Sequence, residues 1–175
     1  LLIWTYALSP AIAGVIWALL TDPAIGLLTD VFNAVGINFN WRQGKDDALI
    51  FLIMAATWKI LGYDILFFLA GLKNIPHEVL EAAALDGANS WTRFCRMVLP
   101  LLRPTILFLL IMNTLYASFE TFGLIDITTQ GGPGRATSLL IYELYQDGFK
   151  SSSRIGLASA QSLVLLGIVA TLTFI

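Results

Sequence analysis

The chain has 175 residues, of which 57% are hydrophobic and 13% are charged, and its formal net charge is −2. Soluble domains are about 45–50% apolar and about 25% charged, so this composition predicts an integral membrane protein. The weakly acidic balance argues against nucleic acid as a partner. A single cysteine, Cys95, excludes an intrachain disulfide and a multi-cysteine metal site. Because the chain begins at Leu1 and stops at Ile175 within apolar runs, we expect it to be a fragment of a longer polytopic protein.

Four apolar segments are long enough to cross a membrane, which takes about 20 residues. They are residues 1–20, 48–72, 105–125 and 156–175. Ser9-Pro10 predicts a kink in the first of them. The expected fold is therefore an all-α integral membrane protein, a polytopic helical bundle that forms one transmembrane domain over residues 1–175.

Two long loops connect these segments. In the first, residues 21–47, apolar positions predict a short amphipathic helix around residues 25–32. In the second, residues 126–155, the run Gly131-Gly132-Pro133-Gly134 excludes regular structure, and a short amphipathic helix is expected at residues 141–149.

The remaining connection, residues 73–103, carries Lys73, Arg93, Arg96 and Arg103. The positive-inside rule places this connection in the cytoplasm. Because spans alternate in direction, both long loops then lie on the opposite side of the membrane.

Residues 75–99 of this connection are predicted to form two short cytoplasmic helices. Glu81 lies in an early turn of the first helix, where it complements the helix dipole. Gly87 suits the left-handed residue that ends this helix, and Asn89 or Ser90 can cap the second. This helix pair is either a capped cytoplasmic loop without a partner or a docking element whose helix lies in a groove of a soluble protein. Small residues around position 83 favour the partner, because they let another surface come close.

The same connection carries a motif with fixed spacing. Glu81-Ala82-Ala83 is followed after three residues by Gly87, and after nine more by Met97-x-Leu99-Pro100. This pattern resembles the EAA signature of the permease subunits of bacterial binding-protein-dependent ABC importers. Met97 stands where the signature has isoleucine, an apolar side chain of similar volume. The similarity extends over the whole chain. Within the family the chain resembles the carbohydrate-uptake type, above all the A-type permeases of sn-glycerol-3-phosphate importers, with maltose-type permeases more distant.

The resemblance implies a type I ABC importer permease of six spans, of which four would be present here. It implies a multi-pass protein of the bacterial inner membrane that works with a second, different permease, two ATPase subunits and a periplasmic solute-binding protein. The sequence contains no P-loop. ATP and Mg²⁺ are therefore expected on the ATPase subunits, and no cofactor, metal or catalytic residue is expected on this chain.

The function implied by the resemblance is to form the channel through which a small polar solute passes from periplasm to cytoplasm. The expected solute is sn-glycerol 3-phosphate, and a sugar or oligosaccharide of the maltose type is the alternative. The resemblance also assigns residues to coupling with the ATPase, of which the first five would contact it and the last two would set the exit into the next span. They are Glu81, Ala82, Ala83, Asp86, Gly87, Leu99 and Pro100.

Ionisable residues within spans are functional candidates by default. Lys59 and Asp64 lie about 140° apart on an ideal helix, so we expect that they do not pair directly with each other. This separation allows one to face a cavity and the other a neighbouring helix. Asn113, Tyr116 and Glu120 form one polar stripe, which either a cavity wall or a polar partner helix would explain. We predict that Lys59, Asn113, Tyr116 and Glu120 line a substrate pathway. The alternative for Lys59 and Asp64 is structural: interhelical ion pairs, or contacts with the missing spans and the second permease.

Two other classes of protein compete with an importer subunit. A membrane-embedded enzyme would use His77, Asp64 and Glu120, although His77 is the only histidine and has no metal-ligand set near it in the sequence. One half of a secondary transporter would instead show uptake driven by an ion gradient without ATP.

Overall fold

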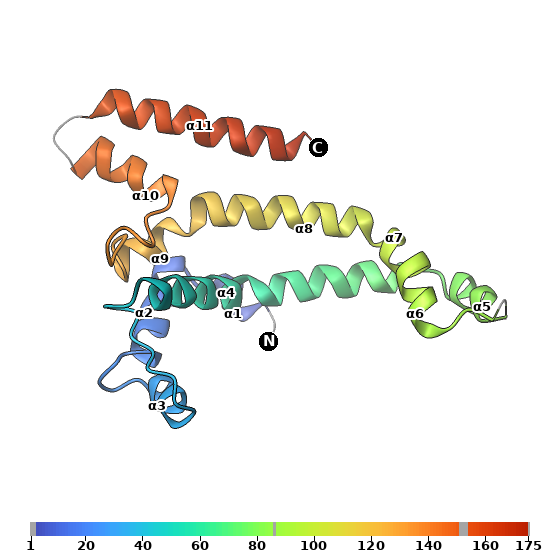
Figure 1. Cartoon of the computed structure of the whole chain (residues 1–175). Helices are drawn as coiled ribbons and strands as arrows, with labels where there is room; N and C mark the ends of the chain where they lie inside the picture. The colour runs from blue at the N-terminus through green and yellow to red at the C-terminus, as the bar shows by residue number, and fades with distance from the viewer. Residues whose placement is uncertain (1–2, 86, 151–153, 175) are drawn as a thin grey trace.

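The computed structural model describes residues 3–85, 87–150 and 154–174, apart from the side chains of His77, Ala82 and Ala84. Every regular element in these ranges is a helix, which confirms the expected all-α class. Three long helical runs lie side by side along the long axis of the molecule (Figure 1). They are α4 (Lys45–Lys73), α8 (Arg103–Leu115) continued by α9 (Phe122–Ile127), and α11 (Ile155–Thr173).

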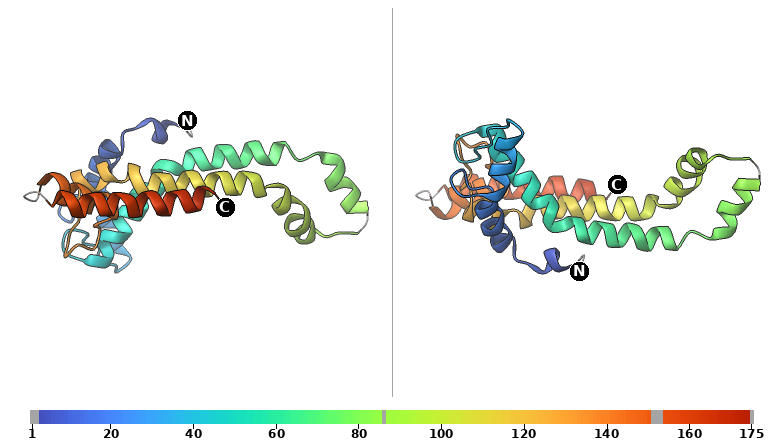
Figure 2. Two further views of the ribbon diagram at one scale, coloured as in Figure 1. Left: turned by 90° about the horizontal axis from the view of Figure 1, so that it is seen from above. Right: turned by 90° about the horizontal axis from the view of Figure 1, so that it is seen from below.

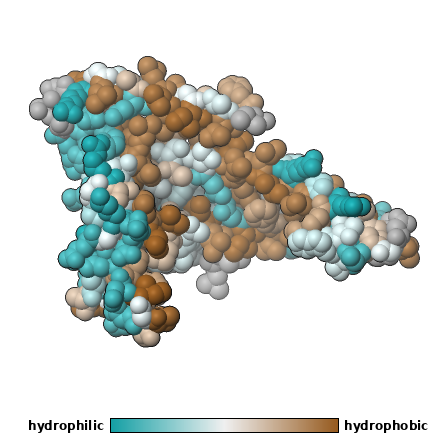
Figure 3. All heavy atoms as spheres, in the orientation of Figure 1, coloured by the Kyte–Doolittle hydropathy of each residue, from teal (hydrophilic) through white to brown (hydrophobic). Residues whose placement is uncertain are grey.

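Each of these runs is long and apolar enough to cross a membrane, so the chain is a multi-pass membrane protein. They correspond to the predicted spans at residues 48–72, 105–125 and 156–175, the last of which is helical as far as Thr173. Figure 3 shows a hydrophobic surface over the long helices, between two more hydrophilic ends. This is the distribution expected of helices that face lipid.

The first predicted span, residues 1–20, is not a single helix. Trp4–Ala7 form α1 and Pro10–Leu20 form α2, with an extended turn between them. Pro10 has no N–H to continue the first helix, and the Ser9 hydroxyl caps α2 by accepting a backbone N–H at 3.4 Å. With 11 residues, α2 is about 16 Å long, too short for a hydrocarbon core of about 30 Å. It crosses the long helices instead (Figure 1). The helix is therefore fully interrupted before Pro10, where the sequence predicted only a kink.

The buried core lies at one end of the long helices, where α2, α4, α9 and α10 (Leu140–Tyr145) meet. Its main cluster consists of Leu52, Ala55, Leu124, Ile125 and Tyr142. α2 packs closely on α9 at Gly14, where a β-carbon would lie only 2.9 Å from Cγ2 of Ile127.

The first long loop is anchored to this core by Trp41. The indole ring stacks on Phe51 at 4.6 Å between centroids, and its N–H donates to the Thr21 carbonyl at 3.0 Å. The expected amphipathic helix is α3 (Leu27–Ala34). The loop is therefore held against the first turns of α4.

The second long loop lies at the same end and leads into α10 and the π-helical turn η3 (Gln146–Lys150), where a loop helix was expected. Arg135 and Ser138 both bond to the carboxylate of Glu143. Burial alone would raise the pKa of Glu143, but these bonds outweigh it and lower the pKa. A lowered pKa stabilises the fold above the unfolded pKa, so this contribution is lost as the pH falls through the folded pKa.

The connection between α4 and α8 projects from the other end of the molecule (Figures 1 and 2). It consists of α5 (His77–Leu85), α6 (Ser90–Arg93), the π-helical turn η1 (Phe94–Val98) and α7 (Leu99–Leu101). Both long loops lie together at one end and this connection lies at the opposite end, as the charge distribution predicts.

The close approach of α2 to α9 can be tested at Gly14. Gly14→Leu is expected to lower stability by about 1–3 kcal/mol, as overpacking typically does, because the new side chain meets α9 at once. The measurement is the thermal unfolding midpoint of the full-length protein in detergent. Gly167→Leu on α11 is the matched control, since its β-carbon meets nothing within 4 Å. Equal midpoints for the two variants would contradict this packing.

Candidate functional site

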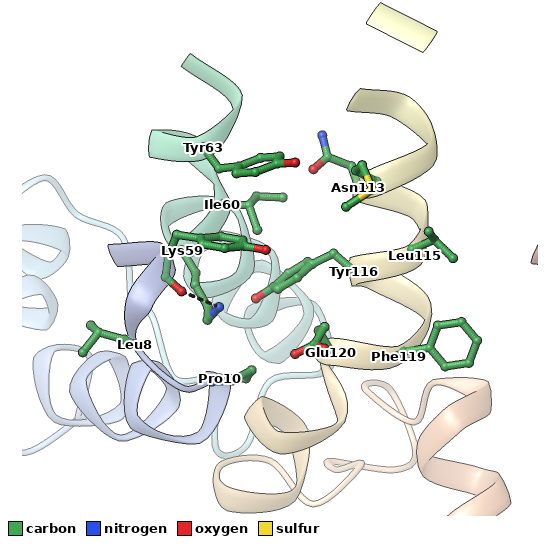
Figure 4. A pocket seen from close by; sticks show the side chains of 12 residues that line it. Leu8, Pro10, Lys59, Ile60, Tyr63, Asn113, Leu115, Tyr116, Phe119 and Glu120 are labelled. Carbon is green, nitrogen blue, oxygen red and sulfur yellow. Dashed lines mark hydrogen bonds between the residues drawn. The ribbon is translucent and has the colours of Figure 1, made fainter. Parts of the chain in front are cut away.

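A cavity of about 380 Å³ lies between α1, α4 and α8 (Figure 4). All four residues predicted to line a substrate pathway contribute to its wall. The lining consists of Tyr6, Leu8, Pro10, Lys59, Ile60, Tyr63, Met112, Asn113, Leu115, Tyr116, Phe119 and Glu120. The structure thus brings Lys59, Asn113, Tyr116 and Glu120 together, while their role in transport stays a prediction.

Lys59 lies at the midpoint of α4 and is only 5% exposed. Its ammonium group donates to the carbonyl of Tyr6 at 3.4 Å. It also lies 5.1 Å from the ring centre of Tyr6 and 5.2 Å from that of Tyr116. Aromatic faces attract cations through their quadrupole, so two tyrosine rings hold the ammonium group at the cavity. A charge at this depth costs about 2.5–3.5 kcal/mol on insertion scales.

Asp64 faces a neighbouring helix instead of the cavity. The amide of Asn113 on α8 donates to both carboxylate oxygens at 3.2 Å. As predicted from their angular separation, Lys59 and Asp64 do not pair with each other, and they bond to Tyr6 and Asn113 respectively. Neither forms an ion pair with another described residue, so Asp64 joins the helices through a hydrogen bond to an amide rather than through opposite charge.

The polar stripe of α8 continues into the π-helical turn η2 (Tyr116–Glu120), a type of turn often found at functional sites. The Tyr116 hydroxyl is buried and has no hydrogen-bond partner in the described part of the chain. Glu120 is exposed and lines the same cavity. The stripe therefore forms a cavity wall, although Asn113 also bonds to α4.

Two tyrosines that line this cavity, Tyr6 and Tyr63, are not among the residues predicted from the sequence, and their rings stack at 4.9 Å. Tyr63 follows Lys59 by four residues, so helical spacing could have placed it on the same face. No sequence signal indicated Tyr6, because it reaches the cavity only through the break before α2.

The set proposed for a membrane-embedded enzyme is not assembled. Asp64 is bonded to Asn113 and does not line the cavity that contains Glu120. The side chain of His77 lies outside the described residues.

The two helices of the α5–α6 connection have the predicted caps. Gly87 adopts a φ of +79°, and the next N–H, of Ala88, donates to the Ala83 carbonyl at 3.0 Å, as in a Schellman motif. Asn89 caps α6 by accepting the N–H of Thr92 at 2.8 Å. Local hydrogen bonds therefore fix the end of α5 and the start of α6.

The residues assigned to ATPase coupling differ in exposure. Glu81 and Gly87 are exposed, whereas Ala83 is 2% exposed and belongs to the packing of the connection itself. Asp86 and the side chain of Ala82 lie outside the described residues. Leu99-Pro100 form most of α7, in the turn that leads into α8.

The tip of the connection also exposes large apolar side chains. Leu85 is 90% exposed and Trp91 is 73% exposed, and the Trp91 ring stacks on Phe94 at 5.9 Å. Exposed large apolar side chains that lie together are typical of an interaction surface, and tryptophan is enriched at binding hot spots.

The bond between α4 and α8 at Asp64 can be tested with a double-mutant cycle. Asn113→Leu is expected to destabilise the protein by about 1–2 kcal/mol, because Asp64 keeps its charge without the amide. Adding Asp64→Leu is expected to restore most of the loss, since no unpaired polar group then remains. The thermal midpoints of both single variants and of the double variant give the coupling energy. Strictly additive effects would contradict the bond.

Comparison with known proteins identifies relatives over nearly the whole chain. The family described as binding-protein-dependent transport system inner membrane component matches residues 3–175. The chain is 45% identical over 173 residues to the sn-glycerol-3-phosphate transport system permease protein UgpA of Rhizobium meliloti, covering 99% of this chain and 59% of that protein. It is 46% identical to UgpA of Brucella abortus with the same coverage, and 44% identical over 175 residues to UgpA of Yersinia enterocolitica. The chain thus spans 59% of the length of these relatives.

Two solved structures share the fold. One is a bacterial ABC transporter involved in the import of the acidic polysaccharide alginate, with a TM-score of 0.77, 23% identity, and coverage of 97% of this chain and 61% of that one. The other is the alginate ABC transporter in complex with an alginate pentasaccharide-bound periplasmic protein, with a TM-score of 0.80, 21% identity, and coverage of 99% and 60%. The family resemblance drawn from the EAA motif is thereby confirmed, and the chain belongs to the family of binding-protein-dependent transport system inner membrane components.

Proposed function

We propose that this chain forms one side of the path by which an ATP-driven importer carries sn-glycerol 3-phosphate from periplasm to cytoplasm across the bacterial inner membrane. The observation that carries the proposal is the midspan cavity, in which a buried lysine at the centre of α4 stands beside a polar stripe of α8. The names of the relatives support this solute.

The proposal requires partners that supply energy and specificity. Because the sequence has no P-loop, ATP and Mg²⁺ would be bound by two ATPase subunits. A second, different permease would complete the path, and a periplasmic solute-binding protein would deliver the solute. A periplasmic protein bound to the structurally similar alginate transporter supports the last of these.

The covalent continuity of α4, the α5–α6 connection and α8 suggests how ATP hydrolysis would reach the cavity. At Gly71 of α4, a β-carbon would lie 2.8 Å from the Thr105 hydroxyl of α8, so the two helices are in close contact at the end nearest the connection. A partner that moves the exposed tip would move both helices together. These helices carry Lys59 and Tyr116, so the motion would reach two walls of the cavity and support alternating access.

An oligosaccharide of the maltose type is the second candidate solute. The stacked rings of Tyr6 and Tyr63 favour it, since they present a flat amphipathic surface to the cavity.

Uptake by the complete complex in proteoliposomes distinguishes these functions. We expect uptake of labelled sn-glycerol 3-phosphate that needs ATP and the binding protein and that excess maltose does not inhibit. Uptake that follows an ion gradient without ATP would contradict an importer of this type. Transport of maltose, but not of the phosphate ester, would favour the second candidate.

Gly87 tests the docking of the tip. Gly87→Phe is expected to reduce solute uptake per ATP hydrolysed by about tenfold or more, as for loss of an interface hot spot. Its β-carbon would meet no described residue within 4 Å, so beyond the backbone strain of its positive φ the added bulk would clash with a partner.

Gly36→Phe is the matched control for Gly87→Phe. Gly36 has a φ of +83°, close to the +79° of Gly87, and equally open surroundings, but it lies in the loop after α3 at the opposite end. The backbone strain is therefore equal in the two variants. An equal ratio of uptake to hydrolysis in both would count against docking at Gly87.

A further inference from the structure

The ammonium group of Lys59 has hydrogen-bonding capacity that the described residues do not use. An ammonium group has three N–H donors, and the only acceptor found for Lys59 in the described ranges is the Tyr6 carbonyl, at 3.4 Å. No described carboxylate pairs with it. Because Lys59 is only 5% exposed, water solvates its ammonium group poorly. The group is therefore a buried cation that faces a cavity with free donors.

Tyr116 brings a second donor to the same place from the opposite helix. Its ring lies 5.2 Å from the ammonium nitrogen of Lys59, and its residue is 8% exposed. Its hydroxyl is buried without a partner among the described residues. Figure 4 shows the Lys59 and Tyr116 side chains pointing toward one another across the cavity. Buried polar groups are nearly always hydrogen-bonded, yet the Tyr116 hydroxyl and two of the three Lys59 N–H groups have no acceptor among the described residues.

The missing acceptor has a definite chemistry. A phosphate group offers several strong acceptor oxygens with negative charge, and charge-assisted bonds to such a group are the strongest of their kind. Lipid headgroups lie at the membrane surfaces, whereas Lys59 lies at the middle of its span. A solute inside the path can therefore supply this acceptor, whereas a lipid headgroup cannot reach it.

Glu120 adds a negatively charged acceptor to the same cavity. It lines the same cavity and forms no ion pair with Lys59 within the described residues. A carboxylate repels an anion and accepts hydrogen bonds from hydroxyl groups. Glu120 lies one helical turn after Tyr116 in η2, beside the donors. A solute that carries both an anionic group and hydroxyl groups matches these donors and this carboxylate.

We propose that Lys59 and Tyr116 form an anion subsite halfway along the path, which binds the phosphate of a phosphorylated polyol in transit, while Glu120 accepts hydrogen bonds from its hydroxyl groups. The proposal rests on the function proposed above and adds the residues that select the anionic group. Tyr6 holds the cation in place through its ring and its carbonyl.

The test compares Lys59→Met, Lys59→Arg and Tyr116→Phe in the complete complex in proteoliposomes. Lys59→Met is expected to lower uptake of labelled sn-glycerol 3-phosphate by about tenfold or more, as for loss of a bond to a charged group. ATP hydrolysis stimulated by the loaded binding protein is expected to remain. Lys59→Arg keeps the charge and is expected to retain most uptake, and Tyr116→Phe is expected to give a smaller loss. Removing a midspan charge favours insertion, so Lys59→Met should reach the membrane normally.

Lys73→Met is the matched control, because it removes the same charge from the exposed end of the same helix. It is expected to leave uptake unchanged. Wild-type uptake by Lys59→Met, equal losses in Lys59→Met and Lys59→Arg, or a parallel loss of uptake and hydrolysis would each overturn the anion subsite. Absence of ATP-dependent uptake by the unsubstituted complex would instead contradict the proposed function itself.

Discussion

The candidate site depends on the packing of α4 against α8. At Gly71 the helices come so close that a β-carbon would lie 2.8 Å from the hydroxyl oxygen of Thr105. Further along, two phenylalanine rings pack at 5.1 Å, and the Asn113 amide donates to Asp64 at 3.2 Å. Lipid supplies no hydrophobic force between membrane helices, so small residues, ring contacts and polar bonds must hold them together. This contact sets two walls of the cavity and supports the projecting α5–α6 tip.

The ammonium group of Lys59 lies at the middle of its span, where a charge is most costly in a membrane. The tyrosine rings at 5.1 and 5.2 Å from the Lys59 nitrogen offset part of the penalty, but they accept no conventional hydrogen bond from it. A neutral side chain would be more favourable for insertion alone. The position is thus better explained by interaction with an anion than by packing.

The tip lies at the end of the α4–α8 pair, whereas the cavity lies beside the middle of α4, and the two have contrasting chemistry. At the tip, Leu85 and Trp91 are exposed on helices that local caps keep in shape. At the cavity, polar groups are buried among rings. A rigid exposed surface suits a soluble partner, and buried unsatisfied donors suit a small polar solute. This contrast supports a division of roles within the α4–α8 hairpin, with docking of a partner at the tip and passage of a solute at the cavity.

Local geometry made several of these features predictable from the sequence. The angular separation of Lys59 and Asp64 on one helix sends them to different neighbours, whatever those neighbours are. Helical spacing equally places Asn113, Tyr116 and Glu120 on one face, and a glycine at position 87 suits a left-handed φ wherever the helix lies. The three long spans follow from hydropathy and length alone. In each case the cause is contained within one helix, so neighbouring residues are enough.

Features that depend on distant segments were decided only by the tertiary structure. The helix that follows the break at Ser9-Pro10, α2, lies across the bundle because Gly14 lets it approach α9. The two helices are about a hundred residues apart in the sequence. That crossing brings Tyr6 to Lys59, a contact that no spacing indicates. Burial of Ala83, and the choice of Asn113 as the partner of Asp64, likewise depend on which surfaces meet. Sequence thus determined the helices and their faces, whereas the cavity exists only because packing brings three separate segments together.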